Sequence, residues 1–255
     1  MFLTHADAQL YTVSFGSGPR TILALGGWVG SWELWTAPFT ILSQSWRTVA
    51  FDHRGCGASI APLDSITVPT MVADVLAVVD ALGIEQCVLA AESAGVAIAL
   101  QAALAHPDRF IGLICVAGLY HRPIPLAPDP FVASLRANYR AALAQFVDAC
   151  VPEPDSTAVR HWGRQIVNRT EQEAAIRLYE CMDGLDLRPF VSQIHQPTLI
   201  LHGTADSIQP MQASQWLATQ IPHNQLHLLP GAGHVPTITR PQDVVRSINE
   251  YFIEP

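Results

Sequence analysis

Three side chains of the kinds that cooperate in nucleophilic catalysis stand at separate places in the chain. Ser93 is flanked by small residues, Asp206 follows an apolar run, and His234 follows a glycine-containing turn. A serine hydroxyl is a weak nucleophile until a neighbouring base takes its proton, and histidine is such a base when a carboxylate orients its ring. The order serine, aspartate, histidine therefore predicts nucleophilic catalysis, provided that the fold brings the three together.

The segment Ala91-Glu92-Ser93-Ala94-Gly95 predicts a sharp turn from a strand into a helix, because an apolar run precedes it and an alanine-rich stretch follows it. Only small residues fit two positions before and after the centre of such a turn, and Ala91 and Gly95 are small. The turn would expose Ser93 at the carboxyl end of the sheet, above a helix N-terminus that favours developing negative charge. Serine is also a common helix N-cap, so the turn alone leaves both interpretations open.

Short apolar runs and helical patterns alternate along most of the chain. The runs predict strands over residues 10–15, 21–25, 48–51, 87–91, 111–116, 197–202 and 225–229, the first of them an edge strand. The patterns predict helices over residues 31–42, 67–82, 94–105, 210–220 and 241–252. Continuous apolar strands alternating with helices predict an α/β fold with a mostly parallel central sheet, flanked by helices on both faces.

Residues 120–186 interrupt this alternation with three helical patterns and no strand. The pair Asp129-Pro130 is typical of an N-cap and a first helical residue, and the apolar spacing continues from there to Cys150. Two further helices are expected to begin at Asp155 and Glu171. We therefore predict three segments: the first part of an α/β core over 1–119, an inserted helical cap over 120–186, and the second part of the core over 187–255.

Two further segments are expected at the same edge of the sheet. Leu25-Gly26-Gly27-Trp28 follows one expected strand, and Asp-His-Arg-Gly-Cys-Gly-Ala-Ser, residues 52–59, follows the next. With the turn at Ser93 and the order serine, aspartate, histidine, they resemble the oxyanion loop, the Asp-x-Arg-Gly-x-Gly-x-Ser turn and the nucleophile elbow of the α/β-hydrolase fold family. The resemblance covers nearly the whole chain. Family members usually have histidine at the position of Gly26 and often glycine at that of Ala91, and both replacements here keep a small residue.

The resemblance implies a role for each of these residues. Ser93 would be the nucleophile, His234 the base that takes its proton, and Asp206 the carboxylate that orients the imidazole. The backbone N–H groups of Trp28 and Ala94 would form the oxyanion hole, where one lost donor can cost about 3 kcal/mol. Residues expected to contact the substrate are Gly27, Glu92, Trp162 and Tyr179.

Two residues near this set have other expected roles. We expect the Glu92 carboxylate to be solvated or paired with Arg54. His202 is expected to be a packed residue at a strand end, because no spacing of histidine, cysteine or acidic residues supports a metal site. Neither a metal nor a cofactor is expected.

The expected function is that of a serine hydrolase, which cleaves a small, largely apolar carboxylic ester or lactone through an acyl-enzyme intermediate. Tryptophans near the serine favour an apolar substrate, although arginines in the cap would favour an anionic one: the first are Trp28, Trp32 and Trp35, the second Arg122, Arg136 and Arg140. The alternatives are a cofactor-free perhydrolase or a carbon–carbon bond hydrolase on the same triad, and a receptor or signalling protein of this fold with little turnover.

Composition narrows the partners to small molecules. Charged residues make up 14 % of the 255 residues, and the formal net charge is −8, with no basic stripe to neutralise the phosphates of a nucleic acid. Apolar runs are far shorter than the roughly 20 residues of a membrane span, so no membrane association is expected. The N-terminus has no signal-peptide pattern, and five scattered cysteines suggest neither a disulfide framework nor zinc, so the expected location is the cytoplasm.

Overall fold

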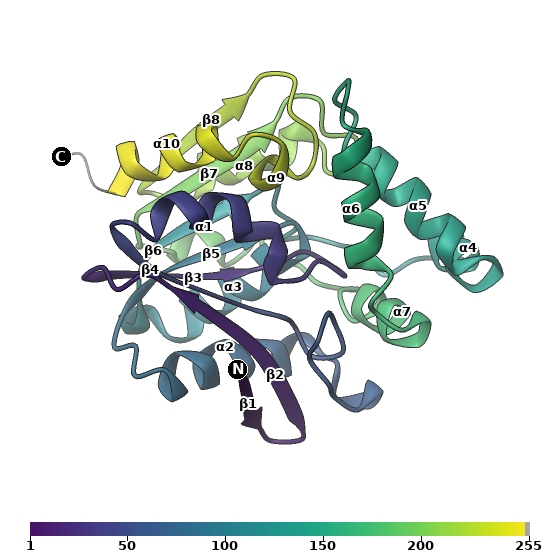
Figure 1. The fold of residues 1–255 in the computed structure, drawn as a ribbon, viewed down its shortest axis with the longest axis horizontal. Coiled ribbons are helices and arrows are strands. Elements are labelled where there is room, and N and C mark those ends of the chain that lie inside the picture. Colours follow the sequence, from purple (N-terminus) through teal and green to yellow (C-terminus); the bar gives the residue numbers. More distant parts are fainter. Residues whose placement is uncertain (253–255) are drawn as a thin grey trace.

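The computed structural model describes residues 1–252, in which eight strands form one sheet in the order β1-β2-β4-β3-β5-β6-β7-β8 (Figure 1). β1 and β2 pair antiparallel with their neighbours, and the pairs from β4 to β8 are parallel. The predicted α/β fold with a mostly parallel sheet is therefore confirmed. The strands are β1 Phe2–His5, β2 Ala8–Phe15, β3 Arg20–Leu25, β4 Trp46–Phe51, β5 Cys87–Glu92, β6 Phe110–Val116, β7 Thr198–Gly203 and β8 Asn224–Leu229.

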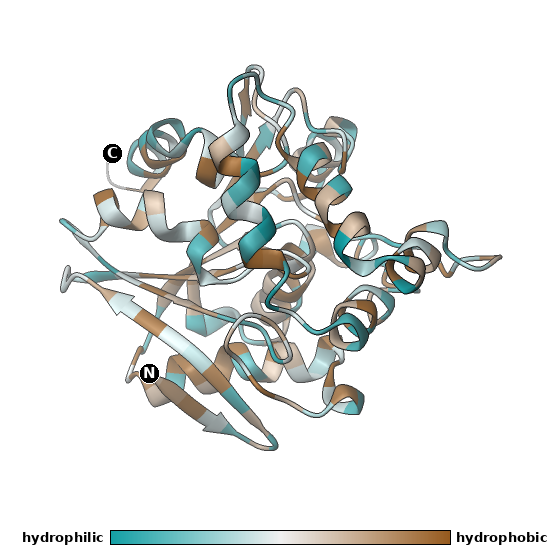
Figure 2. Ribbon diagram, turned by 45° about the vertical axis from the view of Figure 1, so that its right-hand side comes forward, coloured by the Kyte–Doolittle hydropathy of each residue, from teal (hydrophilic) through white to brown (hydrophobic). Residues whose placement is uncertain are grey.

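The prediction of an edge strand over residues 10–15 was wrong. β2 lies between β4 and a short strand, β1, that covers its outer side. β2 alternates hydrophobic and polar residues along its length (Figure 2), which is the pattern of a half-buried strand anywhere in a sheet. The strand at this edge of the sheet is β1, whose four residues, FLTH, are too few to show a period.

Helices cover both faces of the sheet. On one face lie α2 Val68–Ala81, α3 Ala94–Ala105 and α8 Met211–Gln220. On the other lie α1 Thr36–Leu42, which follows a 3₁₀ turn at Trp32–Trp35, with α9 Pro236–Thr239 and α10 Pro241–Phe252 (Figure 1). Each face buries its own apolar cluster, as a parallel sheet requires. Among the described residues, no helix has both the length and the apolar character needed to cross a membrane.

Between β6 and β7 the chain forms helices alone, which project from the carboxyl end of the sheet (Figure 1). Four are present rather than the three expected: α4 Pro130–Ala137, α5 Tyr139–Cys150, α6 Thr157–Val167 and α7 Gln172–Glu180. The first expected helix is broken at Asn138, whose extended backbone ends α4 and whose side chain accepts from the Ala141 N–H to begin α5. α6 begins two residues late because Asp155 has a φ of +58°. The division of the chain into core and cap stays a prediction; below, the cap and the cap helices are names for α4 to α7 with the segments that join them.

The two chain segments that lead into and out of these helices pair with each other. His121 and Asp186 form an isolated antiparallel β-bridge. The Arg122 N–H donates to the Leu185 carbonyl at 2.8 Å, and the Leu187 N–H donates to the Tyr120 carbonyl at 2.9 Å. We call this two-stranded connection, residues 120–122 with 185–187, the stem. The chain enters and leaves the helices between β6 and β7 through this stem.

Candidate active site

The turn between β5 and α3 holds Ser93 in a strained backbone conformation. Its φ of 53° and ψ of −122° lie outside the regions favoured by residues with a side chain. The Ser93 N–H donates to the Val116 carbonyl at 2.8 Å, and the Ser93 carbonyl accepts from the Leu119 N–H at 3.0 Å. These bonds to β6 and the loop after it hold the strained residue in place. The Ser93 hydroxyl makes no capping bond to α3, so the interpretation as a simple N-cap does not hold.

Close backbone packing explains the small residues around this turn. A Cβ on Gly95 would lie 2.3 Å from the Gly26 carbonyl oxygen, so only glycine fits there. A Cβ on Gly27 would lie 3.1 Å from the Ser93 Cβ. The loop after β3 therefore runs directly beside the serine, as the sequence predicted.

The two residues expected to form the oxyanion hole flank the serine. Ala94 is the first residue of α3, and Trp28 follows the loop after β3. The Trp28 indole donates to the Ala175 carbonyl at 2.7 Å and packs edge-on against Phe146, with ring centroids 5.1 Å apart. These contacts with the cap helices fix the loop that carries the Trp28 N–H. The oxyanion hole itself stays a prediction.

The fold brings Ser93, His234 and Asp206 into one hydrogen-bonded row. His234 Nε2 lies 2.9 Å from Ser93 Oγ, and His234 Nδ1 lies 2.8 Å from Asp206 Oδ2. The other oxygen of Asp206 accepts from the N–H groups of Ile208 at 2.8 Å and Gln209 at 3.0 Å. Burial opposes ionisation of Asp206, but the His234 bond and these N–H groups outweigh it, so the pKa of Asp206 is lowered. An ionised carboxylate thus orients the imidazole toward the serine.

His202 is a second histidine beside Asp206, and it is fully buried at the end of β7. Its Nδ1 lies 2.8 Å from Ser214 Oγ and its Nε2 3.1 Å from the Gln209 carbonyl oxygen. Burial lowers the pKa of His202 despite the nearby Asp206 charge, so the ring is neutral and packed in place, as expected. Within residues 1–252, no group of three or more histidine, cysteine or acidic side chains is placed to hold a metal ion.

The expectation that Glu92 is solvated or paired with Arg54 was wrong. Glu92 is 1 % exposed, and one of its oxygens accepts from the Thr237 hydroxyl at 3.0 Å while the other has no partner. Burial raises the pKa of Glu92 to about 8, and the Asp206 charge adds to the effect. Glu92 is the last residue of β5, and its partner Thr237 lies in α9, far along the chain. No local signal in the sequence therefore showed this contact.

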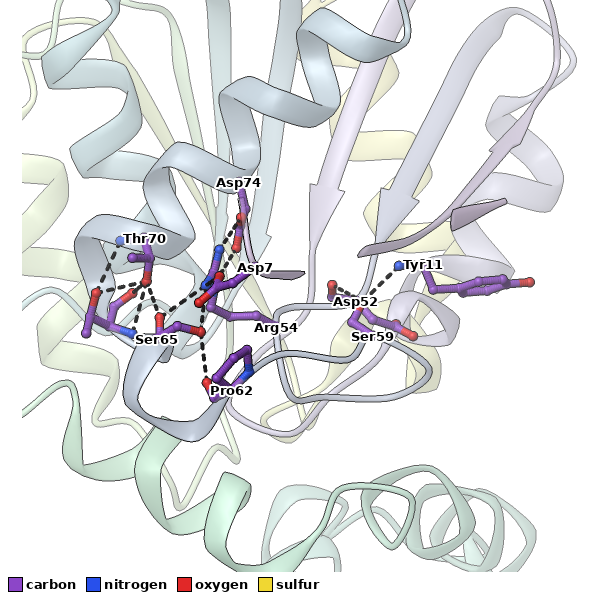
Figure 3. Close-up of polar contacts among 10 residues, drawn as sticks. Asp7, Tyr11, Asp52, Arg54, Ser59, Pro62, Ser65, Thr70 and Asp74 are labelled. Atoms are coloured by element: carbon purple, nitrogen blue, oxygen red, sulfur yellow. Dashed lines mark hydrogen bonds and ion pairs between the residues drawn. The ribbon is translucent and has the colours of Figure 1, made fainter. Parts of the chain in front are cut away.

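Arg54 lies in a different cluster, at the start of the loop between β4 and α2 (Figure 3). Its Nε and Nη2 each lie 2.7 Å from an oxygen of Asp74 on α2. Its Nη1 donates to Asp7 at 3.1 Å and to the Ser65 hydroxyl at 2.8 Å. We call these four residues the Arg54 cluster. Each nitrogen of the guanidinium has an acceptor in this cluster or in the Ser65 backbone, and Glu92 is not among these acceptors.

A cavity opens directly above the serine. The space between its atoms, counted together with the open mouth, is about 590 Å³. Ser93 and His234 form part of its wall, together with Gly27 and Glu92. The remaining wall is almost entirely apolar and comes from loops and short helices beside the sheet and from the cap helices: Trp28, Val29, Gly30, Leu34, Phe146, Val147, Cys150, Val151, Val159, Gly163, Ile166, Val167, Val235 and Ile238.

Two of the four expected substrate contacts lie outside this wall. Tyr179 packs against Trp28, and its hydroxyl lies 3.3 Å from Asp129 Oδ2. Trp162 is half-buried on α6, which turns Val159, Gly163 and Ile166 to the cavity instead. The aromatic Trp162 was expected to contact the substrate, whereas smaller residues of the same helix line the cavity. The helical spacing of these smaller residues was the available signal.

Comparison with known families and sequences extends these observations. A family model described as alpha/beta hydrolase fold matches residues 20–241. A protein assigned as the carbamate hydrolase RutD, from Caulobacter sp. (strain K31), is 28 % identical over 239 residues, which cover 89 % of this chain and 88 % of that protein. A pimeloyl-[acyl-carrier protein] methyl ester esterase from Nitrosomonas europaea (strain ATCC 19718) is 28 % identical over 256 residues, 93 % of this chain and 97 % of that enzyme.

Solved structures show the same fold. The crystal structure of the enol-lactonase from Burkholderia xenovorans LB400 superposes with a TM-score of 0.90 at 23 % identity, covering 98 % of this chain and 99 % of that one. Identity at this level supports the architecture and carries no substrate with it.

Proposed function

Because the chain belongs to the α/β-hydrolase fold family and is an enzyme, we propose that it is a serine hydrolase acting on a small, largely apolar carboxylic ester or lactone through an acyl-enzyme intermediate. The observation that carries the proposal is the row from Asp206 through His234 to Ser93, which ends on the wall of an apolar cavity. A purely structural role for His234 would not explain why its partner, Ser93, lies in a strained turn beside such a cavity.

In the proposed mechanism, His234 Nε2 takes the proton from Ser93 Oγ as this oxygen attacks the carbonyl carbon. Asp206 accepts from His234 Nδ1–H and stabilises the imidazolium that forms. The carbonyl oxygen becomes an oxyanion, which the N–H groups of Trp28 and Ala94 would hold. Collapse of this intermediate breaks the ester bond, and the imidazolium gives its proton to the leaving alkoxide. Water, activated by His234, then hydrolyses the acyl-serine and restores the free enzyme.

The charges around the cavity support an apolar substrate. No lysine or arginine belongs to its wall. Glu92, with its pKa raised to about 8, is mostly neutral at pH 7, so it leaves no full negative charge beside the serine. The cap arginines do not supply a positive one: Arg122 pairs with Asp129 and Asp183, Arg136 pairs with Glu173, and Arg140 is exposed.

The test begins with covalent labelling. A fluorophosphonate is expected to label Ser93, as mapped by peptide mass spectrometry, and Ser93→Ala should abolish both labelling and turnover. Ser17→Ala, at an exposed serine, is the control and should leave both unchanged. Labelling at another serine, with Ser93 untouched, would contradict the assignment.

A substrate panel tests the chemical class. We expect kcat/KM to rise from acetate to butyrate and hexanoate p-nitrophenyl esters, by up to about fourfold for each methylene that the cavity accepts. The panel adds a dodecanoate ester, a lactone, a dicarboxylate half-ester and an alkyl carbamate, the last because a relative is assigned as a carbamate hydrolase. A preference for the half-ester over neutral esters of equal length would overturn the apolar assignment, and a product burst followed by almost no turnover would indicate a receptor.

A further inference from the structure

The segment that joins α5 to α6 in the cap reaches the loop that carries His234. The backbone N–H of His234 donates to the Cys150 carbonyl at 2.9 Å. The backbone N–H of the preceding residue, Gly233, donates to the side-chain Oε1 of Glu153 at 2.8 Å. Two consecutive N–H groups of this core loop therefore bind acceptors that belong to the cap and not to the sheet.

The loop that carries Asp206 is tied to the same part of the cap. The Ser207 hydroxyl donates to the carbonyl of Ala149, at the end of α5, at 3.0 Å. The acid loop and the base loop, which come from the ends of β7 and β8, thus meet residues 149–153. This five-residue segment thus binds the backbone of His234 and the side chain of Ser207, the residue next to Asp206.

Among the described residues, the Glu153 side chain has one hydrogen-bond partner, the Gly233 N–H. It is 5 % exposed, and its second oxygen has no hydrogen-bond partner. Arg160 holds the local backbone by donating to the carbonyls of Glu153 at 2.9 Å and Val151 at 3.0 Å. A Cβ on Gly233 would lie 2.5 Å from the Cys150 carbonyl oxygen, so glycine is needed for the loop to approach the segment. Burying a carboxyl group costs free energy unless a specific bond repays it, and here that bond is to Gly233.

We infer that Glu153 is a positioning residue for His234: its carboxyl group, with the Cys150 carbonyl, fixes the loop backbone so that the imidazole spans Ser93 and Asp206. This inference rests on the proposed function of these three residues. The loop contains Gly231 and Gly233, which resist displacement weakly, so it depends on outside acceptors to keep its place. The cap is therefore part of the scaffold of the acid–base pair as well as a wall of the cavity.

Because Glu153 does not line the cavity, its loss should affect the chemical step more than binding. Glu153→Ala is expected to lower kcat by about 100-fold, the scale of a displacement near 1 Å, and to leave KM almost unchanged. Glu153→Gln keeps an oxygen acceptor and should retain most of the wild-type kcat. Glu153→Asp keeps the carboxyl group but falls short of Gly233, so it should resemble Glu153→Ala. Glu173→Ala, at an exposed carboxylate of the same cap, is the matched control.

A second measurement does not depend on turnover. The proton between His234 Nδ1 and Asp206 gives a low-field NMR resonance, which should shift or broaden in Glu153→Ala and Glu153→Asp and stay in place in Glu153→Gln. An unmoved resonance with wild-type kcat in Glu153→Ala would overturn the inference, and so would equal losses of kcat in the Gln and Ala variants. Failure of the wild-type protein to hydrolyse any ester or to label at Ser93 would instead overturn the proposed function, while the resonance still tests the positioning.

Discussion

The Arg54 cluster, after β4, and the surroundings of Ser93, after β5, both place polar side chains at the carboxyl end of the sheet, but they differ in how completely these side chains are bound. In the Arg54 cluster, each guanidinium nitrogen has an acceptor (Figure 3). In the same loop, Asp52 accepts from the Trp32 N–H at 2.7 Å and the Ala58 N–H at 2.8 Å. Burial raises the pKa of Asp52 to about 6, and those two N–H groups limit the rise.

Around Ser93 the bonding is left incomplete. The serine sits in a strained conformation beside the cavity, and one Glu92 oxygen has no partner. A closed set of hydrogen bonds contributes to stability, whereas groups left open to a cavity are available to a substrate. The comparison teaches that buried charge alone does not mark the site in this molecule; the site lies where a strained serine and an unpartnered carboxyl oxygen meet a cavity.

The largest expected effect is on kcat, and it should distinguish Asp206 from Asp52, two buried aspartates that each follow a strand. Asp206→Asn should lower kcat by about 10⁴-fold, because asparagine no longer holds the imidazole in the right tautomer or stabilises its positive charge. Asp52→Asn, the matched control, should keep kcat close to that of the wild-type enzyme. Ester hydrolysis at saturating substrate measures both, with circular dichroism to check the fold. Near-wild-type turnover in Asp206→Asn would mean that the acid lies elsewhere.

The next effect concerns stability. Arg54→Met is expected to lower the free energy of unfolding by about 3–5 kcal/mol, because Asp74 would remain as a buried charge without its partner. Urea denaturation measures this change. Arg109→Met breaks the more exposed pair with Asp80 and should cost less than about 1 kcal/mol. Similar decreases in the free energy of unfolding in the two variants would show that burial does not make the Arg54–Asp74 pair more important for stability than the exposed pair.

Glu92 gives a smaller effect that depends on pH. Its pKa of about 8 in the folded protein exceeds the ordinary 4.5, so the unfolded chain releases this proton first as the pH rises. The stability that Glu92 contributes is complete below pH 4.5 and is lost as the pH rises through about 8. The total is at most about 5 kcal/mol, since one pKa unit corresponds to about 1.4 kcal/mol.

Glu92→Gln is neutral at every pH and should remove this loss. Urea denaturation at pH 5 and at pH 9 measures it, as the decrease in stability of the wild-type protein relative to the variant. Glu85→Gln, at an exposed carboxylate, should keep the wild-type pH dependence. Parallel stability curves for Glu92→Gln and the wild-type protein would contradict the raised pKa.

The smallest effect tests the shape of the cavity. Val159→Phe adds volume to the wall formed by α6 and should shorten the preferred acyl chain, with a loss of about fourfold in kcat/KM for each methylene excluded. Acetate esters should be almost unaffected. Val132→Phe, on α4 and outside the wall, is the control for the same substitution. An unchanged ratio of hexanoate to acetate rates in Val159→Phe would place the acyl chain elsewhere.

Much of the fold could be predicted because its signals are local. α3 and α10 begin and end where the sequence predicted, since alanine and apolar spacing define the first and Pro241 opens the second. The turn at Ser93 was recognisable because its small residues stand between an apolar run and an alanine-rich stretch. The break at Asn138 was missed because the apolar spacing continues across it, so that only the local capping bond distinguishes two helices from one.

The contacts that were missed join distant parts of the chain. Glu92 and Thr237 are separated by 145 positions, and Glu153 and Gly233 by 80. Neither pair has a period or a spacing that a single sequence displays. The order serine, aspartate, histidine was found because Ser93 stands in a known motif. Glu153 stands in no motif, so its contact with Gly233 is identified only from the three-dimensional structure.

The stem has a consequence for how such enzymes diversify. Since residues 120–122 and 185–187 bind each other, the ends of the helical insertion are held together whatever lies between them. A recombination event or an engineer could exchange the whole insertion for one of another length without moving the sheet. The graft would succeed as a fold more easily than as a catalyst, because the new segment must also bring an acceptor to the Gly233 N–H. Transplantability thus depends on the paired ends of the insertion, and activity depends on a segment in its middle, residues 149–153.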